Sequence, residues 1–398
     1  MKGYHPKGIV WALLSALMVI CCSDCGGGLL TAGGGIGGTG FISRGIIAAF
    51  GSIFVNGTEF DTSNAVIVVE GEEIGIGDQI ALENLDIGKV VTVEGTVTED
   101  GANVADRVIY NDEVEGPVES IQDIDAAAKE MVVLGQTVII DDLTEFKGTT
   151  FGAIAENDVV EVSGLVDDTG AIQATFLEKT GEFLPGLIVE VKGFVKNLDI
   201  ELETFNINDL TVNYSVADLS ALPGGVLAED LFVEVEGVLD ATGGEMVATE
   251  IELEDELGDE DADEVEVMGF VTDFRSVFDF DVGNQVVETD VDTVFVGGRP
   301  EDVAPGVRLE AEGSLEAGIL FAKEIEFWDP DRIEVTGVVT DFVSVSEFTV
   351  DNQAVQTDGN TVFEDLTPDD IQLGVSLEVE GVVTDGVLLA DKIGPGNG

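Results

Sequence analysis

Histidine and cysteine are almost missing from this sequence. The only histidine is His5, and the three cysteines are Cys21, Cys22 and Cys25. Beyond residue 25 the chain therefore lacks the side chains of Ser-His-Asp and Cys-His catalysis and the ligands of ordinary zinc sites. It also has no phosphate-binding loop with its lysine, and no G-x-G-x-x-G motif that opens a helix. These absences predict a protein that is not an enzyme and has no organic cofactor.

Basic residues are scarce as well. The chain has 16 Lys and Arg against 81 Asp and Glu, for a net charge of −65. Nucleic-acid binding depends on Lys and Arg that neutralise phosphates, so no nucleic-acid partner is expected. Direct adhesion to anionic lipid is disfavoured for the same reason. A carboxylate pair could still hydrolyse glycans, but such a cleft needs aromatic side chains, and Trp328 is the only tryptophan after residue 21.

The N-terminus has the pattern of an export signal. Lys2 and Lys7 precede an apolar run of about a dozen residues, which suits a signal peptide better than a membrane span. The run ends in cysteines and resembles a bacterial lipobox. Residues 1–21 are therefore predicted to be a lipoprotein signal peptide, with Cys22 as the lipidated residue. Cys21 and Cys25 are the alternatives, and an ordinary secretory signal is the competing interpretation.

Residues 22–40 are glycine-rich and are expected to form a tether. The anchor would place the protein in the bacterial cell envelope as an outer-membrane or periplasmic lipoprotein. Attachment to the membrane would then occur through the lipid alone.

One short element recurs along the rest of the chain. Val91–Val97 alternates apolar and polar residues with period two, as a strand with one buried face does. A glycine interrupts the alternation in each copy and predicts a β-bulge or sharp bend. Successive glycines lie about 70 residues apart, the size of a small domain. These glycines are Gly95, Gly164, Gly237, Gly313 and Gly381.

Other landmarks keep the same register. Each copy has an opening strand with a glycine, a tight hairpin, the glycine-interrupted strand and a closing strand. A short helical turn is expected before the glycine-interrupted strand, as at Thr367–Asp370 with its proline. The predicted fold is all-β: five tandem, small, antiparallel, five-stranded OB-like barrels. The predicted repeats are 41–112, 113–182, 187–254, 264–328 and 332–393, with an acidic linker at 255–263.

Three motifs carry a family resemblance. They are Gly34–Gly40 (GGIGGTG), Phe50–Gly57 (FGSIFVNG) and Val133–Val138 (VLGQTV). These segments resemble the bacterial family called domain of unknown function 5666. The resemblance implies an exported β-rich repeat protein of the cell envelope, and it implies no reaction.

Carboxylates raise the question of calcium, because hard cations prefer oxygen ligands. Asp259, Asp261 and Asp263 are the candidate ligands in the acidic linker, although the glycine and distal glutamate of an EF-hand loop are missing. The alternative is a solvated, self-repelling linker. Acids also recur in the glycine-interrupted strand, where an outward-facing structural role is preferred to a repeated ligand site. They are Glu94, Glu236, Glu312 and Glu380, with Ser163 in the second repeat.

The sequence thus predicts a lipid-anchored envelope protein that acts as a non-catalytic binding, spacer or structural module, with an unknown protein or glycan partner. The first alternative is a calcium-stiffened adhesin, for which oxygen cages between domains would be the evidence. The second is a carboxylate-dependent glycan hydrolase, which would show a cleft with two carboxylates and stacked aromatics.

Overall fold

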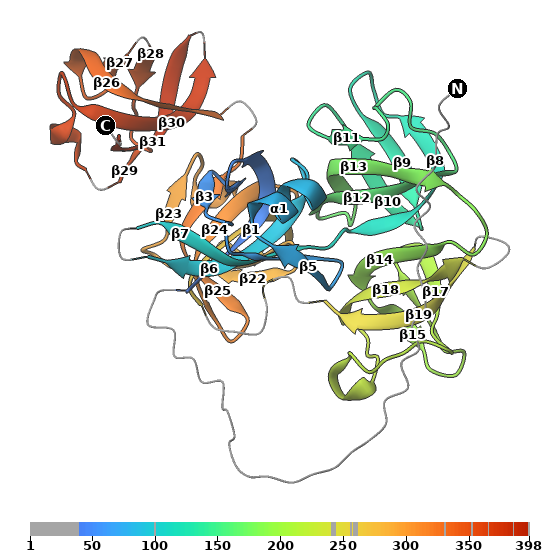
Figure 1. The fold of residues 1–398 in the computed structure, drawn as a ribbon. Coiled ribbons are helices and arrows are strands. Elements are labelled where there is room, and N and C mark those ends of the chain that lie inside the picture. The colour runs from blue at the N-terminus through green and yellow to red at the C-terminus, as the bar shows by residue number, and fades with distance from the viewer. Residues whose placement is uncertain are drawn as a thin grey trace, which may run out of the picture. The chain divides into compact units, whose positions relative to one another are not determined.

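The computed structural model describes residues 40–98, 101–239, 244–254, 257, 262–329, 332–351, 353–364, 366–384 and 386–396. In these residues nearly all regular structure is β-strand, as predicted (Figure 1). The predicted signal peptide, Cys22 and almost the whole tether lie outside the described residues. No helix in the described part is long and apolar enough to cross a membrane.

The fourth repeat shows the basic unit most clearly. Its opening strand β20 pairs with β21 and β24, β21 pairs with β22, β22 runs parallel to β25, and β25 pairs back with β24. This closed ring has the five strands of the predicted OB-like barrel, and the parallel pairing of β22 with β25 departs from the all-antiparallel prediction. A short strand and a 3-10 helix precede the glycine-interrupted strand. The elements are β20 (Ala262–Ser276), β21 (Asp279–Val282), β22 (Gln285–Glu288), β23 (Val294–Val296), η2 (Pro300–Asp302), β24 (Arg308–Glu316) and β25 (Ile319–Phe327).

The second, third and fifth repeats have the same order of pairing. In the third repeat the opening strand is divided into β14 and β15. The second repeat comprises β8 (Val114–Asp123), β9 (Lys129–Val133), β10 (Gln136–Ile140), β11 (Glu145–Lys147), β12 (Asp158–Val166) and β13 (Ile172–Glu182). The third comprises β14 (Ile188–Phe194), β15 (Lys196–Asp199), β16 (Thr204–Ile207), β17 (Leu210–Asn213), η1 (Pro223–Gly225), β18 (Phe232–Leu239) and β19 (Glu245–Leu253). The fifth comprises β26 (Arg332–Ser344), β27 (Glu347–Val350), β28 (Gln353–Gln356), β29 (Val362–Phe363), η3 (Pro368–Asp370), β30 (Ser376–Thr384) and β31 (Val387–Pro395).

The first repeat carries an addition to this plan. A hairpin and the one α-helix of the described residues stand where the fourth and fifth repeats have a short strand and a 3-10 helix. A separate, earlier hairpin consists of β2 and β3. It meets the closing strand β7 only through the bridge between Val104 and Asp61, the residue that follows β3. The elements are β1 (Gly40–Phe50), β2 (Ile53–Val55), β3 (Thr58–Phe60), β4 (Val66–Val69), β5 (Glu72–Ile76), α1 (Asp78–Asn84), β6 (Val90–Val97) and β7 (Asn103–Tyr110).

The recurring glycine forms a β-bulge in every repeat, which confirms the prediction. The register between the glycine-interrupted and closing strands shifts at each one. A Cβ on Gly95 would lie 2.1 Å from the carbonyl oxygen of Val104, and one on Gly237 would lie 2.4 Å from that of Val247. Only glycine lets the closing strand approach this closely.

The hairpin turns and the helical turn also follow the sequence signals. Asn56, Asn208 and Asp351 all have φ near +50°, as tight hairpin turns require. Thr367 caps η3 through a reciprocal capping box with Asp370. These local features are therefore encoded by short stretches of sequence.

Repeats that are distant in sequence share sheets. Phe41–Arg44 of β1 pairs in parallel with Glu264–Val267 of β20, which joins the first and fourth repeats. Glu190 and Val191 of β14 pair with Glu115 and Val114 of β8, which joins the second and third. The second and third repeats also share one continuous hydrophobic core.

Candidate functional site

Four buried or half-buried carboxyl groups meet where the first and third repeats approach each other. We call Glu70, Asp112, Glu190 and Glu234 the acid cluster. Glu70 follows β4 of the first repeat, and Asp112 lies in the connection from β7 to β8. Glu190 and Glu234 lie on the neighbouring strands β14 and β18 of the third repeat. The cluster therefore exists only when these repeats are docked.

The carboxylates are very close together. One oxygen each from Glu70, Glu190 and Glu234 lies within 4.8 Å of the other two. The backbone fixes Glu70, whose amide donates to the Tyr110 carbonyl at 3.0 Å and whose φ is +47°. The Asp112 amide donates to Glu70 Oε1 at 3.0 Å. These contacts join the loop after β4 to the connection between the first two repeats.

Several oxygens in this region have no donor. Asp112 Oδ1 and the neighbouring Asn111 Oδ1 are buried and accept no hydrogen bond, and the buried Glu70 Oε2 and Glu190 Oε1 have no donor beyond a proton shared between their two carboxyl groups. Asp112 is only 3% exposed. A buried acceptor without a donor is costly and needs an explanation.

Lys192 provides a positive charge beside the cluster. Its side chain is 3% exposed, and its Nζ lies 3.4 Å from Glu254 and 3.8 Å from Glu234. Burial alone would lower the pKa of Lys192, but the carboxylates of Glu254, Glu113 and Glu234 raise it above its ordinary value. Lys192 therefore remains charged.

Proton binding by the acids is strongly favoured in this environment. Burial, followed by the charge of Glu70, raises the pKa of Glu190 to about 10. Burial likewise raises the pKa of Glu234 to about 7, against the opposing effect of Lys192. Burial and then the charges of Glu70 and Glu190 raise the pKa of Asp112 well above its usual range. The cluster thus has excess negative charge that protons or a cation must neutralise.

A second acid pair lies at the seam between the first and fourth repeats. Ser43 donates a 2.8 Å hydrogen bond to Glu266, its register partner across the parallel pairing. Burial, and then the neighbouring Glu266, raises the pKa of Glu310 well above its usual range. The raised pKa of Glu310 therefore favours its protonated form, which can donate a hydrogen bond to Glu266.

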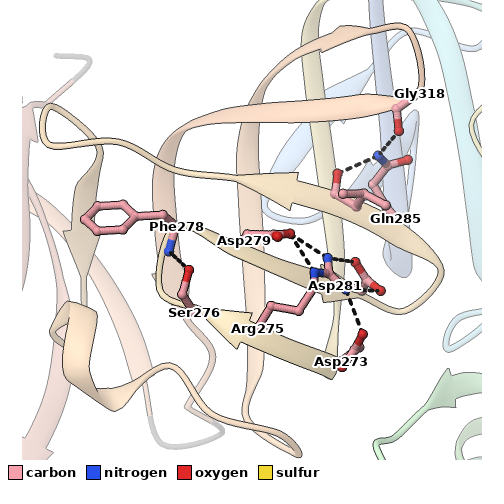
Figure 2. A network of polar contacts seen from close by, with 9 residues as sticks. Asp273, Arg275, Ser276, Phe278, Asp279, Asp281, Gln285 and Gly318 are labelled. Carbon is pink, nitrogen blue, oxygen red and sulfur yellow. Dashed lines mark hydrogen bonds and ion pairs between the residues drawn. The ribbon is translucent and has the colours of Figure 1, made fainter.

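An exposed charge network occupies the first hairpin of the fourth repeat. Figure 2 shows the Arg275 guanidinium surrounded by Asp273, Asp279 and Asp281. Gln285, the first residue of β22, donates to the Gly318 carbonyl and so connects β22 to the turn before β25. Gln353 makes the same contact with Gly386 in the fifth repeat. These contacts stabilise the repeat and offer no open ligand position.

A polar groove of about 360 Å³ lies between the fourth and fifth repeats. It contains three carboxylates, from Asp302, Asp358 and Asp391, and the guanidine-bearing Arg299. None of its lining residues is aromatic. The lining is Gly297, Gly298, Arg299, Asp302, Gln356, Thr357, Asp358, Asn360, Leu389, Ala390 and Asp391. The groove therefore lacks the stacking surface expected of a glycan-hydrolase cleft.

Only one of the three sequence-predicted calcium ligands lies in the described residues, so that site stays a prediction. Asp259 and Asp261 lie outside them, and Asp263 is an exposed residue near the start of β20. The recurring acids behave differently from one another: Glu236 and Glu312 are exposed, whereas Glu94 contacts Arg107 at 3.6 Å.

Sequence reasoning missed the acid cluster. Glu190 and Glu234 lie on strands with the same acidic alternation as exposed strands, and Glu70 and Asp112 lie in connections between strands. The sequence contains one signal. Lys192, a basic residue in a chain that has few, comes directly after the run Val189–Val191.

Comparisons with known proteins identify the family of this chain. No curated protein matches the chain. Among solved structures the chain is similar to "drosophila Unr CSD456", with 15% identity over 51% of this chain and 94% of that chain, and a TM-score of 0.13. The profile described as Domain of unknown function (DUF5666) matches residues 39–109, 115–178, 196–252, 268–326 and 336–394. Because these five segments cover more than half of the sequence, the chain belongs to this family.

Proposed function

We propose that this protein is a non-catalytic structural module of the cell envelope, in which the tandem barrels act as a docked assembly rather than as independent domains. The observation that carries the proposal is the parallel pairing of Phe41–Arg44 with Glu264–Val267. These strands lie more than 200 residues apart, so their pairing holds together the two ends of the segment that contains the second and third repeats. A module of this kind holds a binding surface in a fixed orientation, or keeps two other components at a fixed distance.

Side-chain contacts between repeats support the same role. Lys89 in the first repeat contacts Glu161 in the second at 2.8 Å, and its side chain is 4% exposed. Gln136 in the second repeat donates to the Ile207 carbonyl in the third. Lys392 in the fifth repeat contacts Glu324 in the fourth at 3.1 Å. Buried charged and polar contacts of this kind favour one specific arrangement of the repeats.

Attachment and location follow from the N-terminal sequence. The apolar run before Cys22 supports export and lipidation, and the glycine-rich tether would separate the anchor from the first barrel. The large negative charge favours solubility and disfavours nucleic acid as a partner. The partner of the module would be a protein or a glycan of the envelope.

Hydrogen exchange of the full chain tests the docked arrangement. Residues 41–44 and 264–267 are flanked by strands on both sides, whereas 332–338 of β26 pairs only with β30 in the described residues. We expect slower exchange in the first two segments than in 332–338, which serves as the internal control. Equal exchange in all three segments would mean that the barrels move independently, and the proposal would fail.

A further inference from the structure

We propose that the acid cluster of Glu70, Asp112, Glu190 and Glu234 binds one divalent cation of the calcium type, between the first and third repeats. The site is separate from the acidic linker at 255–263. It is independent of the proposed envelope role, because a cation can bind the docked repeats wherever the protein is located.

The unpartnered oxygens point to a ligand. Asp112 is only 3% exposed, its Oδ1 has no hydrogen-bond partner, and its own amide is bonded to Glu70 within the cluster. Glu70 Oε2 and Glu190 Oε1 are also buried, and apart from a proton shared between these two carboxyl groups they have no donor. Carboxylate oxygens without donors are suitable ligands for a hard cation.

The spacing of the oxygens suits calcium. Oxygens of Glu70, Glu190 and Glu234 all lie within 4.8 Å of one another. Calcium binds oxygen at about 2.3–2.6 Å, so ligands on opposite sides of one ion lie up to about 5 Å apart. Magnesium demands near-ideal octahedral geometry and usually keeps several of its waters, so an irregular group of protein carboxylates favours calcium.

The charge balance also favours a cation. Within the described residues, carboxyl groups outnumber the basic side chains in this region, which include Lys192, Arg44 and Lys89. Lys192 is closest to Glu254 and Glu234, and Arg44 lies 3.7 Å from Glu113. The remaining carboxylates repel one another unless protons or a metal neutralise them. The carboxyl groups include Glu70, Asp112, Glu113, Glu161, Glu190, Glu234 and Glu254.

Calcium titration of the chelator-treated full chain tests the site. The variant is Glu190→Gln, which keeps the shape of the side chain and removes a ligand charge. The control is Glu316→Gln, which changes an exposed acid at the end of β24. Calorimetry measures binding, with magnesium and with sodium at matched ionic strength as competing salts. Circular dichroism and thermal unfolding in chelator report whether each variant folds.

We expect the wild type and Glu316→Gln to share one saturable, calcium-selective site with a raised unfolding midpoint. Glu190→Gln should bind at that site at least tenfold more weakly, while its midpoint in chelator equals or exceeds that of the wild type. Glu234→Gln provides a second variant with the same expected loss. Equal calcium binding by all variants would overturn the proposal, since the ion would then bind elsewhere on the acidic surface. Equal stabilisation by calcium and sodium would also overturn it, because the salts would then act only by screening the acidic surface.

The result is distinguishable from a failure of the structural role. Slow hydrogen exchange at residues 41–44 with no calcium site would support the docked assembly and contradict only the metal site. Calcium binding that is lost in Glu190→Gln, together with fast exchange at 41–44, would support the metal site and contradict the pairing of the first and fourth repeats.

Discussion

Ser43 Oγ donates a 2.8 Å hydrogen bond to Glu266 Oε2, although the two residues are 223 positions apart. Both belong to the parallel pairing of β1 with β20, and Ser43 is 2% exposed. The bond gives the half-buried Glu266 carboxylate a donor at the seam. Hydrogen bonds to charged groups contribute about 1.5–3 kcal/mol, so this contact is a sensitive test of docking.

Replacing Ser43 with alanine should destabilise the protein by about 1–3 kcal/mol, because the buried carboxylate loses a donor. Denaturant unfolding of the full chain measures the loss. Ser346→Ala in the fifth repeat is the matched control: it is exposed, and its hydroxyl lies 3.0 Å from that of Ser344. Its effect should stay within about 0.5 kcal/mol. Equal effects of the two substitutions would show that the seam does not form in solution.

The Glu266–Glu310 pair should make the stability of this seam depend on pH. Burial, and then Glu266, raises the pKa of Glu310. A raised folded-state pKa contributes stability below the unfolded value near 4.5, and that contribution is lost as pH rises through the folded value. Glu310→Gln stays neutral at every pH and still donates to Glu266. Relative to the wild type it should be nearly neutral at about pH 4.5 and increasingly stabilising from about pH 7 to 9.

Paired unfolding experiments at about pH 4.5, 7 and 9 give this difference directly. Because both proteins carry the same remaining acids, subtraction removes the general effect of the net charge. Glu316→Gln provides a control at an exposed position on the same strand. A difference between Glu310→Gln and the wild type that does not change with pH would contradict the shared proton.

The bulge glycines should tolerate no side chain. A Cβ at Gly237 would lie 2.4 Å from the Val247 carbonyl oxygen, whereas a Cβ at Gly181 on β13 would have no atom within 4 Å. Gly237→Ala should cost about 1–3 kcal/mol or more through overpacking against backbone. Gly181→Ala should change stability by no more than about 0.5 kcal/mol. Thermal unfolding of the two variants decides the matter, and a tolerated Gly237→Ala would mean that the bulge can relax.

Local sequence accounts for the single repeat but not for its docking. The bulge at Gly95 and the capped turn at Thr367 depend on residues next to each other, so period and glycine placement reveal them. The parallel pairing of β1 with β20 depends on two surfaces built from separate repeats. Nothing in the alternation of either strand distinguishes that edge from an exposed one.

The acid cluster escaped prediction for the same reason. Glu190 and Glu236 face each other across β14 and β18, and both fit the pattern of outward-facing acids. Only Glu190 is half-buried, because the first repeat covers it, whereas Glu236 stays exposed.

Ser163 gave a usable hint of the contact between the first and second repeats, since it replaces the recurring glutamate. It is 1% exposed and accepts a 2.9 Å bond from the Val90 amide of the first repeat.

Lys89 should contribute strongly to docking of the first two repeats. It contacts Glu161 at 2.8 Å and lies 3.9 Å from the centre of the Tyr110 ring, while the Tyr110 hydroxyl donates to the same glutamate. Replacing Lys89 with methionine leaves Glu161 with a nearly buried, uncompensated charge, so we expect a loss of about 3–5 kcal/mol. The double variant with Glu161→Gln should recover part of this loss, because it also removes the stranded charge. Lys196→Met breaks an exposed pair with Asp230 and should cost at most about 1 kcal/mol. Denaturant unfolding of these variants and of Glu161→Gln alone completes the double-mutant cycle. A Lys89→Met effect no larger than that of Lys196→Met would mean that Lys89 is exposed to water rather than buried between the repeats.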